Sequence, residues 1–571
     1  MIGRVREAPV AAIYFRHMLK LLKLQMFFLF SIAALYAGAQ AVQPFVEHWD
    51  SLRTIKKSEG LFVSGREWGE WNFYDRQGRL IEKAQFKAGD RDGLVQIYYD
   101  NGQLQHEGFF KRGVEDSLRT SWYRDGDIME TGAYADGKKS GEWTYFYPDS
   151  MPMLRENWQD TLVLVIDAWD KDGTQTLKEG NGTLRTYYAS DSLQEESEYV
   201  LGVKSGMSRE FYPAGNRKSE GEFRSGVKHG EWKYWFSNGK LEKIDHYDKG
   251  KLHGSYKIWF PNEQLEVEGF YDQGKKDSLW VWYRRDGGKD MEGFFQADLR
   301  HGAWRYWHIN DQLSATGSFD RDREHGEWVH YYEGGQLWKK GNWIEGKKDG
   351  TWTTRFESGQ KLQEGAYVNG VEEGEWKSWF ENGQQKTIGT FKEGKMDGLW
   401  RGWFPNGDPD HEGNYKADQK HGPWKLYHQS PPEKQIGGRV REEGSYVEGK
   451  KSGRWTTYSI HGTPIAEGLY ANGVKSGRWT FYDDAGVKMR EQDFANGEPH
   501  GTTIVYDRQA RKVQEMSYKD GRLHGTMTFF DRNGQPERTI EYVNGQKKVN
   551  LPPAASEGKG AKPAQVPGGR R

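Results

Sequence analysis

The 571-residue chain carries 82 Lys and Arg against 83 Asp and Glu, together with 25 Trp, 31 Tyr, 72 Gly and no cysteine. This near-balance of charge excludes a bulk field that would attract nucleic acid or an anionic membrane. The lack of cysteine excludes disulfides, cysteine-ligated zinc, a cysteine nucleophile and an acylated lipoprotein anchor. With 35% hydrophobic residues and 15% aromatic residues, the composition favours short strands and tight turns over a thick apolar core.

The N-terminal residues have the pattern of a secretory signal peptide. Lys20 and Lys23 precede an apolar run over 26–37, and small residues up to Ala41 then give a cleavage pattern. A permanent transmembrane anchor is the alternative, although the run is short for the roughly 20 residues that a membrane span needs. We predict a signal peptide over 1–41, with Met18 as an alternative start, followed by a linker over 42–59. The protein is then expected in the periplasm, the outer envelope or the extracellular space.

A 24-residue repeat fills residues 60–548 and is clearest from Gly230 to His253, after which Gly254 starts the next copy. Insertions near 157–177 and 429–437 interrupt the period. A fixed period over this length indicates a repeat architecture, not a set of independent globular domains. The 19 starts are Gly69, Gly93, Ser117, Gly141, Gly182, Gly206, Gly230, Gly254, Ser278, Gly302, Gly326, Gly350, Gly374, Gly398, Gly422, Gly453, Gly477, Gly501 and Gly525.

Each repeat predicts one β-hairpin. Two strand-like runs, 232–236 and 241–247, flank the pair Asn238-Gly239, which favours a type I′ turn with positive φ at both residues. Lys249-Gly250 then supplies a second short turn that leads into the next hairpin. The predicted fold class is all-β, an elongated single-sheet meander of about 19 stacked β-hairpin repeats of 24 residues, stabilised by contacts between neighbours.

The turn also predicts a register. If the starting residue is position 1, positions that sum to 19 face each other, so a Trp at position 3 lies opposite position 16. Trp occupies position 3 in 12 of the 19 repeats, and position 16 is usually Gly, as in Trp328 and Gly341. We predict that each indole folds over the glycine of its own hairpin. The aromatic at position 18, such as Phe223, shares this face, and the aromatic at position 6, such as Trp235, lies on the opposite face.

The position-3 tryptophans are the candidate interaction surface. Two interpretations remain open at this point: the indoles pack on glycine to hold the sheet, or they stay open and stack against sugar rings or a partner peptide. The candidate residues are Trp232, Trp280, Trp304, Trp328, Trp352, Trp376, Trp400 and Trp424.

Other residue patterns favour structural roles. Histidine precedes the repeat start seven times, but Asp and Ser share this position, which predicts a hydrogen-bonding role at the turn and not a metal site. Asp167, Asp170, Asp172 and Gly173 resemble a calcium loop but lack its bidentate Glu, so we expect an extra strand or hairpin in the first insertion. No catalytic motif occurs, and we predict no enzyme activity, no cofactor and no metal site. The seven histidines are His229, His253, His301, His325, His421, His500 and His524.

The Gly-x-Trp start, the Asn-Gly turn and the junction Gly346–Gly350 (Gly-Lys-Lys-Asp-Gly) resemble the MORN repeat family. The likeness covers about 60–548 and is closer to the bacterial variant, often found in proteins labelled as YwqK-like antitoxins. It implies a stack of β-hairpins used for protein–protein contact, scaffolding or membrane-associated assembly.

These observations predict an exported, non-enzymatic repeat scaffold that mediates protein–protein interaction in the cell envelope or outside the cell. The alternatives are a glycan-binding array that uses the aromatic face, and an antitoxin of the YwqK-like type. The expected partner is a protein, with cell-wall glycan as the alternative and no nucleic acid. Membrane contact is expected only by proximity or through an uncleaved N-terminal segment. The tail over 549–571 is rich in Pro, Gly, Ala and Lys and is predicted to be disordered.

Overall fold

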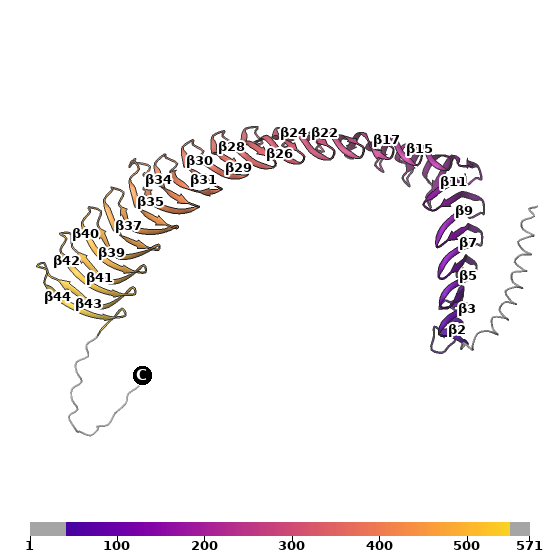
Figure 1. Ribbon diagram of the computed structural model, residues 1–571, viewed down its shortest axis with the longest axis horizontal. Coiled ribbons are helices and arrows are strands. Elements are labelled where there is room, and N and C mark those ends of the chain that lie inside the picture. Colours follow the sequence, from indigo (N-terminus) through magenta and orange to yellow (C-terminus); the bar gives the residue numbers. More distant parts are fainter. Residues whose placement is uncertain (1–41, 549–571) are drawn as a thin grey trace, which may run out of the picture. The chain divides into compact units, whose positions relative to one another are not determined.

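The computed structural model describes residues 42–548, which form 45 β-strands joined by turns, with no helix in that range. Consecutive strands pair antiparallel, so that each repeat is a β-hairpin and successive hairpins stack side by side (Figure 1). The predicted all-β meander is therefore confirmed. Residues 1–41 and 549–571, where a signal peptide and a disordered tail are expected, lie outside the described residues. Within the described range no helix is long and apolar enough to cross a membrane.

The chain divides into two compact units, and the boundary falls within β21 (Leu265–Asp272). One unit ends at Leu265 and also holds Tyr271–Lys275, and the other holds Glu266–Phe270 and continues from Lys276. The strands before β21 are β1 (Val42–His48), β2 (Lys56–Val63), β3 (Arg66–Tyr74), β4 (Leu80–Lys87), β5 (Asp90–Tyr98), β6 (Leu104–Lys111), β7 (Val114–Trp122), β8 (Ile128–Ala135), β9 (Lys138–Phe146), β10 (Pro152–Gln159), β11 (Leu162–Trp169), β12 (Gln175–Lys178), β13 (Asn181–Tyr187), β14 (Leu193–Val200), β15 (Val203–Phe211), β16 (Arg217–Arg224), β17 (Val227–Trp235), β18 (Leu241–Asp248), β19 (Lys251–Leu252) and β20 (Gly254–Trp259).

The strands after β21 keep the same alternation of eight- and nine-residue lengths through most of the second unit. They are β22 (Lys275–Tyr283), β23 (Lys289–Gln296), β24 (Leu299–Trp307), β25 (Leu313–Asp320), β26 (Arg323–Tyr331), β27 (Leu337–Ile344), β28 (Lys347–Arg355), β29 (Lys361–Val368), β30 (Val371–Trp379), β31 (Gln385–Lys392), β32 (Lys395–Met396), β33 (Gly398–Trp403), β34 (Pro409–Lys416), β35 (Gln419–Tyr427), β36 (Val440–Val447), β37 (Lys450–Tyr458), β38 (Pro464–Ala471), β39 (Val474–Tyr482), β40 (Lys488–Ala495), β41 (Glu498–Tyr506), β42 (Lys512–Lys519), β43 (Arg522–Phe530), β44 (Pro536–Val543) and β45 (Gln546–Lys547).

The segment 42–59, predicted as a linker, is instead part of the sheet. Its first seven residues form β1, which pairs with β2 from Val42 opposite Val63 to Phe45 opposite Gly60. The physical reason lies in Phe45, whose ring packs 5.7 Å from that of Trp71, the first position-3 tryptophan of the array. This strand therefore covers the edge of β2, and its Phe45 reaches Trp71 of the first complete repeat.

The two insertions differ in structure. The first supplies the extra strand β11 and the short β12, as expected for an added strand or hairpin, and buries Val165, Ala168, Leu177 and Tyr199 together. The second lies between β35 and β36 and contains no strand.

The hairpin turn differs from the prediction. At Asn238-Gly239 only Gly239 has positive φ (84°), and its amide donates to the Phe236 carbonyl at 2.9 Å. This geometry is a type I turn followed by a left-handed glycine, the three-residue hairpin loop, and not a type I′ turn. The Asn238 side chain favours this form because its Oδ1 accepts the Lys240 amide at 3.0 Å.

The type I′ geometry lies at the junction between repeats. Lys249 (φ 49°) and Gly250 (φ 80°) both occupy the left-handed region, and Asp248 pairs with Lys251 across them. The predicted register still holds in the body of the hairpin, where Gly230 faces Tyr247. One extra residue after the hairpin turn, Glu242, lies opposite the step from Tyr234 to Trp235 and compensates for the longer loop.

Candidate functional site

In each of the two units, the position-3 tryptophans lie on one face of the sheet, called the front face here. Trp232 lies between position 16 of its own hairpin, Asp245, and position 16 of the preceding hairpin, Gly221. Its indole covers Gly221, since a Cβ on that glycine would lie 2.3 Å from Trp232 Cδ2. The same arrangement holds for all twelve position-3 tryptophans. The prediction that each indole covers the glycine of its own hairpin is therefore wrong, because the side chain leans across the junction to the hairpin before it.

A β-bulge at each junction explains why the start reads Gly-x-Trp. Gly230 has a φ of 67°, and the register shifts there so that Gly221 faces Trp232 while Glu222 faces His229. The indole Nε1–H donates to the Glu222 carbonyl at 3.1 Å, within the interrupted stretch of the ladder. All twelve position-3 tryptophans make this bond, at 2.9–3.2 Å. The glycine thus permits the bulge, and the tryptophan supplies a donor beside it.

These indoles are buried. The eight candidate residues Trp232, Trp280, Trp304, Trp328, Trp352, Trp376, Trp400 and Trp424 have exposed fractions of 1–9%. Lys228 lies over the Trp232 ring at 4.0 Å, and Phe223 meets it edge-on at 5.1 Å. An indole covered in this way cannot stack on a sugar ring or a partner peptide without displacing its cover. The front-face row is therefore the core of the sheet, and an accessible aromatic surface must lie elsewhere.

A signal for this packing was present in the sequence. Every position-3 tryptophan follows a glycine at position 16 of the repeat before it, whereas Trp479 faces Gln492 within its own hairpin. Where the tryptophan is replaced, the preceding glycine is generally replaced too, as in Ala84 before Val95. This covariation along the chain indicates that the tryptophan packs on the glycine of the preceding repeat. The register within one hairpin does not contain this information and therefore predicted the wrong glycine.

The predicted turn role of the residue before each repeat start is confirmed. Its side chain accepts the amide of position 20 at the next junction: Asp92 from Arg112 at 3.2 Å, and His524 from Asn544 at 3.3 Å. Asp and His are interchangeable here because both offer an acceptor to the same amide. Within residues 42–548, no group of three His, Asp or Glu side chains could hold a metal ion.

The acidic residues of the first insertion have separate partners. Asp170 binds Arg185 at 2.7 Å, Asp167 pairs with Arg155 at 2.9 Å, and Asp172 accepts the Thr174 amide at 3.0 Å. The arrangement is that of a turn between β11 and β12, and not of carboxylates converging on one ion.

The aromatic residues at position 6 form a row on the opposite face, called the back face here, beside the hairpin turns. They are half-buried. The cation at position 12 of a repeat lies over the ring of the next repeat, as with Lys361 over Trp379 at 5.4 Å and Lys512 over Phe530 at 4.1 Å. We call this set the turn-edge aromatic row: Tyr74, Tyr98, Trp122, Phe146, Tyr187, Phe211, Trp235 and Trp259 in the first unit, and Tyr283, Trp307, Tyr331, Trp379, Trp403, Tyr427, Tyr458, Tyr482, Tyr506 and Phe530 in the second.

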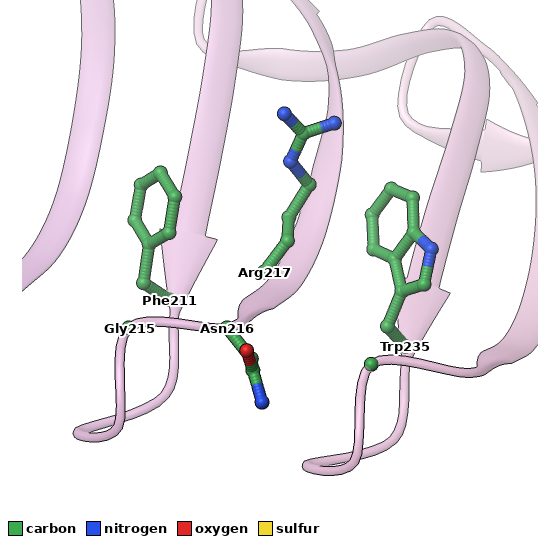
Figure 2. A pocket seen from close by; sticks show the side chains of 6 residues that line it. Phe211, Gly215, Asn216, Arg217 and Trp235 are labelled. Carbon is green, nitrogen blue, oxygen red and sulfur yellow. The ribbon is translucent and has the colours of Figure 1, made fainter.

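A cavity of about 430 Å³ lies between two members of this row, Phe211 and Trp235. Figure 2 shows their rings and the Arg217 side chain rising side by side from the strands, while Asn216 points the other way. Arg217 Cζ lies 5.5 Å from the Trp235 ring centroid, and Asn216 Nδ2 donates to the Ser237 carbonyl of the next turn at 2.8 Å. Neighbouring turns are thus tied together and leave between them a groove with two aromatic walls and a cationic side chain.

Seven segments of the chain match the family model described as MORN repeat variant. These seven segments are MORN repeats of this variant. The matched residues are 91–112, 228–249, 252–273, 324–345, 372–393, 396–417 and 523–544. Each match runs from just after one junction turn to the next junction, so that one MORN repeat corresponds to one hairpin.

No curated protein matches the chain. Among solved structures, the crystal structure of TcdB2-TccC3-Cdc42 is 10% identical, covers 88% of this chain and 30% of its own, and has a TM-score of 0.13. The Tc holotoxin pore of Photorhabdus luminescens is also 10% identical, covers 89% of this chain and 31% of its own, and has a TM-score of 0.12. The chain thus spans about a third of the length of these structures. At such TM-scores neither structure informs its fold or function.

Several tyrosines of the turn-edge aromatic row are held in place by hydrogen bonds from their hydroxyls to carboxylates. Tyr458 donates to Glu443 at 2.6 Å and Tyr482 donates to Glu467 at 2.7 Å, each carboxylate belonging to the preceding repeat. Burial, followed by the bond to Glu443, raises the pKa of Tyr458 to about 12. These hydroxyls stay protonated at neutral pH, and the row presents aromatic surface with fixed polar tips.

One histidine on the front face predicts a local acid sensitivity. His330 stacks on Trp328 with ring centroids 5.9 Å apart, and burial, with Lys339 adding to it, lowers its pKa from 6.5 to about 4. Since the unfolded state binds the proton first, the full stability of β26 and β27 is present above about pH 6.5 and is lost as the pH falls towards 4. Hydrogen exchange of the β26 amides, corrected for intrinsic rates, should show this loss in the wild type. His330→Tyr places the residue that Tyr306 provides one repeat earlier and should abolish the effect. Equal acid sensitivity in both proteins would contradict the assignment.

Proposed function

We propose that the chain is an exported, non-enzymatic scaffold that binds a protein partner in the cell envelope or outside the cell, through the turn-edge aromatic row. The observation that carries this proposal is the row itself: half-buried aromatic side chains, with cations over several of them, recur in successive MORN repeats. Aromatic residues and arginine are the side chains most favoured as anchors at protein interfaces.

The spacing of the row suits an extended partner segment. Equivalent residues of neighbouring repeats are two strands apart, or about 10 Å. A partner segment in the extended polyproline II conformation has three residues per turn and rises about 3.1 Å per residue, so every third side chain points the same way and advances by about 9 Å. Several weak contacts of this kind on one continuous ligand combine into avidity without any single strong site.

Export is supported by the basic, apolar and small-residue pattern over 18–41. Mass analysis of the mature N-terminus tests this part separately from binding. The expected chain begins after Ala39 or Ala41, and an intact Met1 or Met18 in the soluble cytosolic fraction would overturn export.

The binding surface is tested by a pair of matched double variants. Trp379→Ser with Trp403→Ser removes two members of the row, and Glu375→Ser with Leu399→Ser changes two exposed residues on the same face of the same strands. In a crosslinking pull-down from the native envelope, the first variant should capture its partner at least about tenfold more weakly, since losing an aromatic anchor costs about 2 kcal/mol or more. The second variant should behave as the wild type.

Equal capture by both double variants would contradict the proposed surface, provided that both keep the wild-type circular dichroism spectrum. A response of tryptophan fluorescence to cell-wall glycan that only the first variant loses would instead assign the row to glycan.

A further inference from the structure

One position-16 glycine on the front face has no tryptophan over it. Gly108 is a position-16 glycine like those beneath the twelve indoles, but the residue that follows it at position 3 of the next repeat is Arg119. The preceding repeat also lacks the indole, with Val95 at position 3. Two consecutive members of the tryptophan row, between Trp71 and Trp143, are therefore missing.

A cavity of about 90 Å³ lies at this gap, on β5, β6 and β7. Such a volume accommodates one small group and not a sugar ring or an indole. Its lining combines apolar and charged side chains: Arg91, Val95, Ile97, His106, Glu107, Gly108, Phe110, Glu115 and Arg119.

The arginines of the cavity retain unused hydrogen-bond donors. The Nε atoms of Arg91 and Arg119 are buried and have no hydrogen-bond partner among residues 42–548. A buried N–H group without an acceptor is costly, and a bound acceptor would remove that cost.

His106 lies at one edge of the cavity. Its Nδ1 is 3.3 Å from Arg119 Nη2 and 2.8 Å from Ser121 Oγ. Burial, together with Arg119, lowers the pKa of His106 and keeps the ring neutral.

The carboxylates around the cavity already have partners. Glu115 receives Arg119 Nη1 at 3.3 Å, and Glu82 receives Arg91 Nη2 at 2.5 Å. Glu115 Oε1 lies over Gly108, 2.9 Å from the position that a Cβ would take. Glu107 accepts Gln96 Nε2 at 2.6 Å, and Glu130 accepts Ser121 Oγ at 3.2 Å. Acceptors are thus occupied while donors remain.

We propose that this cavity, the Gly108 cleft, binds a single small oxyanion, a carboxylate or phosphate group, through Arg91 and Arg119. Bidentate recognition of such groups is the characteristic chemistry of arginine, and the cavity of about 90 Å³ beside the two side chains provides the room. The group is either a free anion or the terminal carboxylate of a partner chain. The site lies on the face opposite the turn-edge aromatic row and is independent of the proposed scaffold function.

The test uses the full chain and isothermal titration calorimetry with inorganic phosphate, acetate, a short peptide with a free C-terminal carboxylate, and the same peptide amidated. Arg119→Trp restores the residue that covers the equivalent glycine elsewhere and should abolish binding while thermal stability is kept or raised. Arg91→Lys keeps the charge beside Glu82 but lacks Nε, and should weaken binding about tenfold. Arg490→Lys makes the same change on the front face of a distant repeat and should have no effect.

Binding of phosphate or acetate supports a free anion, and binding of the peptide but not of its amidated form supports a chain terminus. The proposal is overturned if none of the four probes binds the wild type. It is also overturned if binding survives Arg119→Trp unchanged, because the anion would then lie outside the cleft.

Discussion

Replacing Trp455 by alanine should lower the local free energy of unfolding by about 3–5 kcal/mol, the cost of removing a buried Trp from a core. Trp455 is 1% exposed, lies over Gly444, is covered by Lys451 and donates Nε1–H to the Ser445 carbonyl at 3.0 Å. A thin sheet has no second layer to refill the space. Hydrogen exchange should show the loss in β36 and β37, while strands several repeats away keep their protection, because the main contacts of each strand are with strands one or two elements away in the chain.

Two further variants separate the parts of this effect. Trp455→Phe keeps most of the cover but leaves the Ser445 carbonyl without its donor, which should cost about 1–3 kcal/mol. Trp403→Ala removes a half-buried ring on the back face and should cost clearly less than Trp455→Ala. A global loss of exchange protection in Trp455→Ala, or equal costs for the two alanine variants, would show that the front-face row is not the local core.

The second large effect is expected from a single added methyl group. Gly444 does not have positive φ, so alanine is compatible with its backbone, but its Cβ would lie 2.2 Å from Trp455 Cδ2. The Trp455 indole must move away from position 444. Gly444→Ala should therefore lower the local free energy of unfolding by about 1–3 kcal/mol or more, as overpacking does.

A double variant tests whether this cost comes from the inter-repeat pair. Gly444→Ala with Trp455→Val recreates the natural pair Ala84 and Val95. The double variant should be less destabilised than the sum of the two single changes, with a coupling of about 0.5–3 kcal/mol measured by exchange in β36 and β37. Additive costs would contradict direct packing of the indole on the preceding repeat.

The two faces of the sheet divide the aromatic residues by role. Front-face indoles are fixed by glycine, lysine and a carbonyl acceptor, so they hold neighbouring repeats together. Back-face rings at position 6 keep part of their surface open beside grooves such as that between Phe211 and Trp235. Residue type alone does not distinguish these roles, since both rows are rich in tryptophan. Burial distinguishes them.

The sequence by itself determined the repeat, the hairpin in each copy and the register of its strands. These features follow from local chemistry: glycine at fixed intervals, strand-forming runs between turns, and a period of 24 residues. The role of the residue before each repeat start was also predictable, because Asp, Ser and His share only their capacity to bond a turn.

The tertiary structure alone decided what each tryptophan covers and which face stays open. The bulge at Gly230 rotates the chain so that Trp232 meets Gly221 of the hairpin before it, and this displacement depends on backbone angles that the hairpin pattern does not specify. The type I′ turn likewise lies at Lys249-Gly250 and not at Asn238-Gly239, because the Asn238 side chain bonds the Lys240 amide and stabilises a longer loop. The strand β1 was not predicted for the same reason. It is stabilised by the packing of Phe45 on Trp71, a contact between residues far apart in the chain.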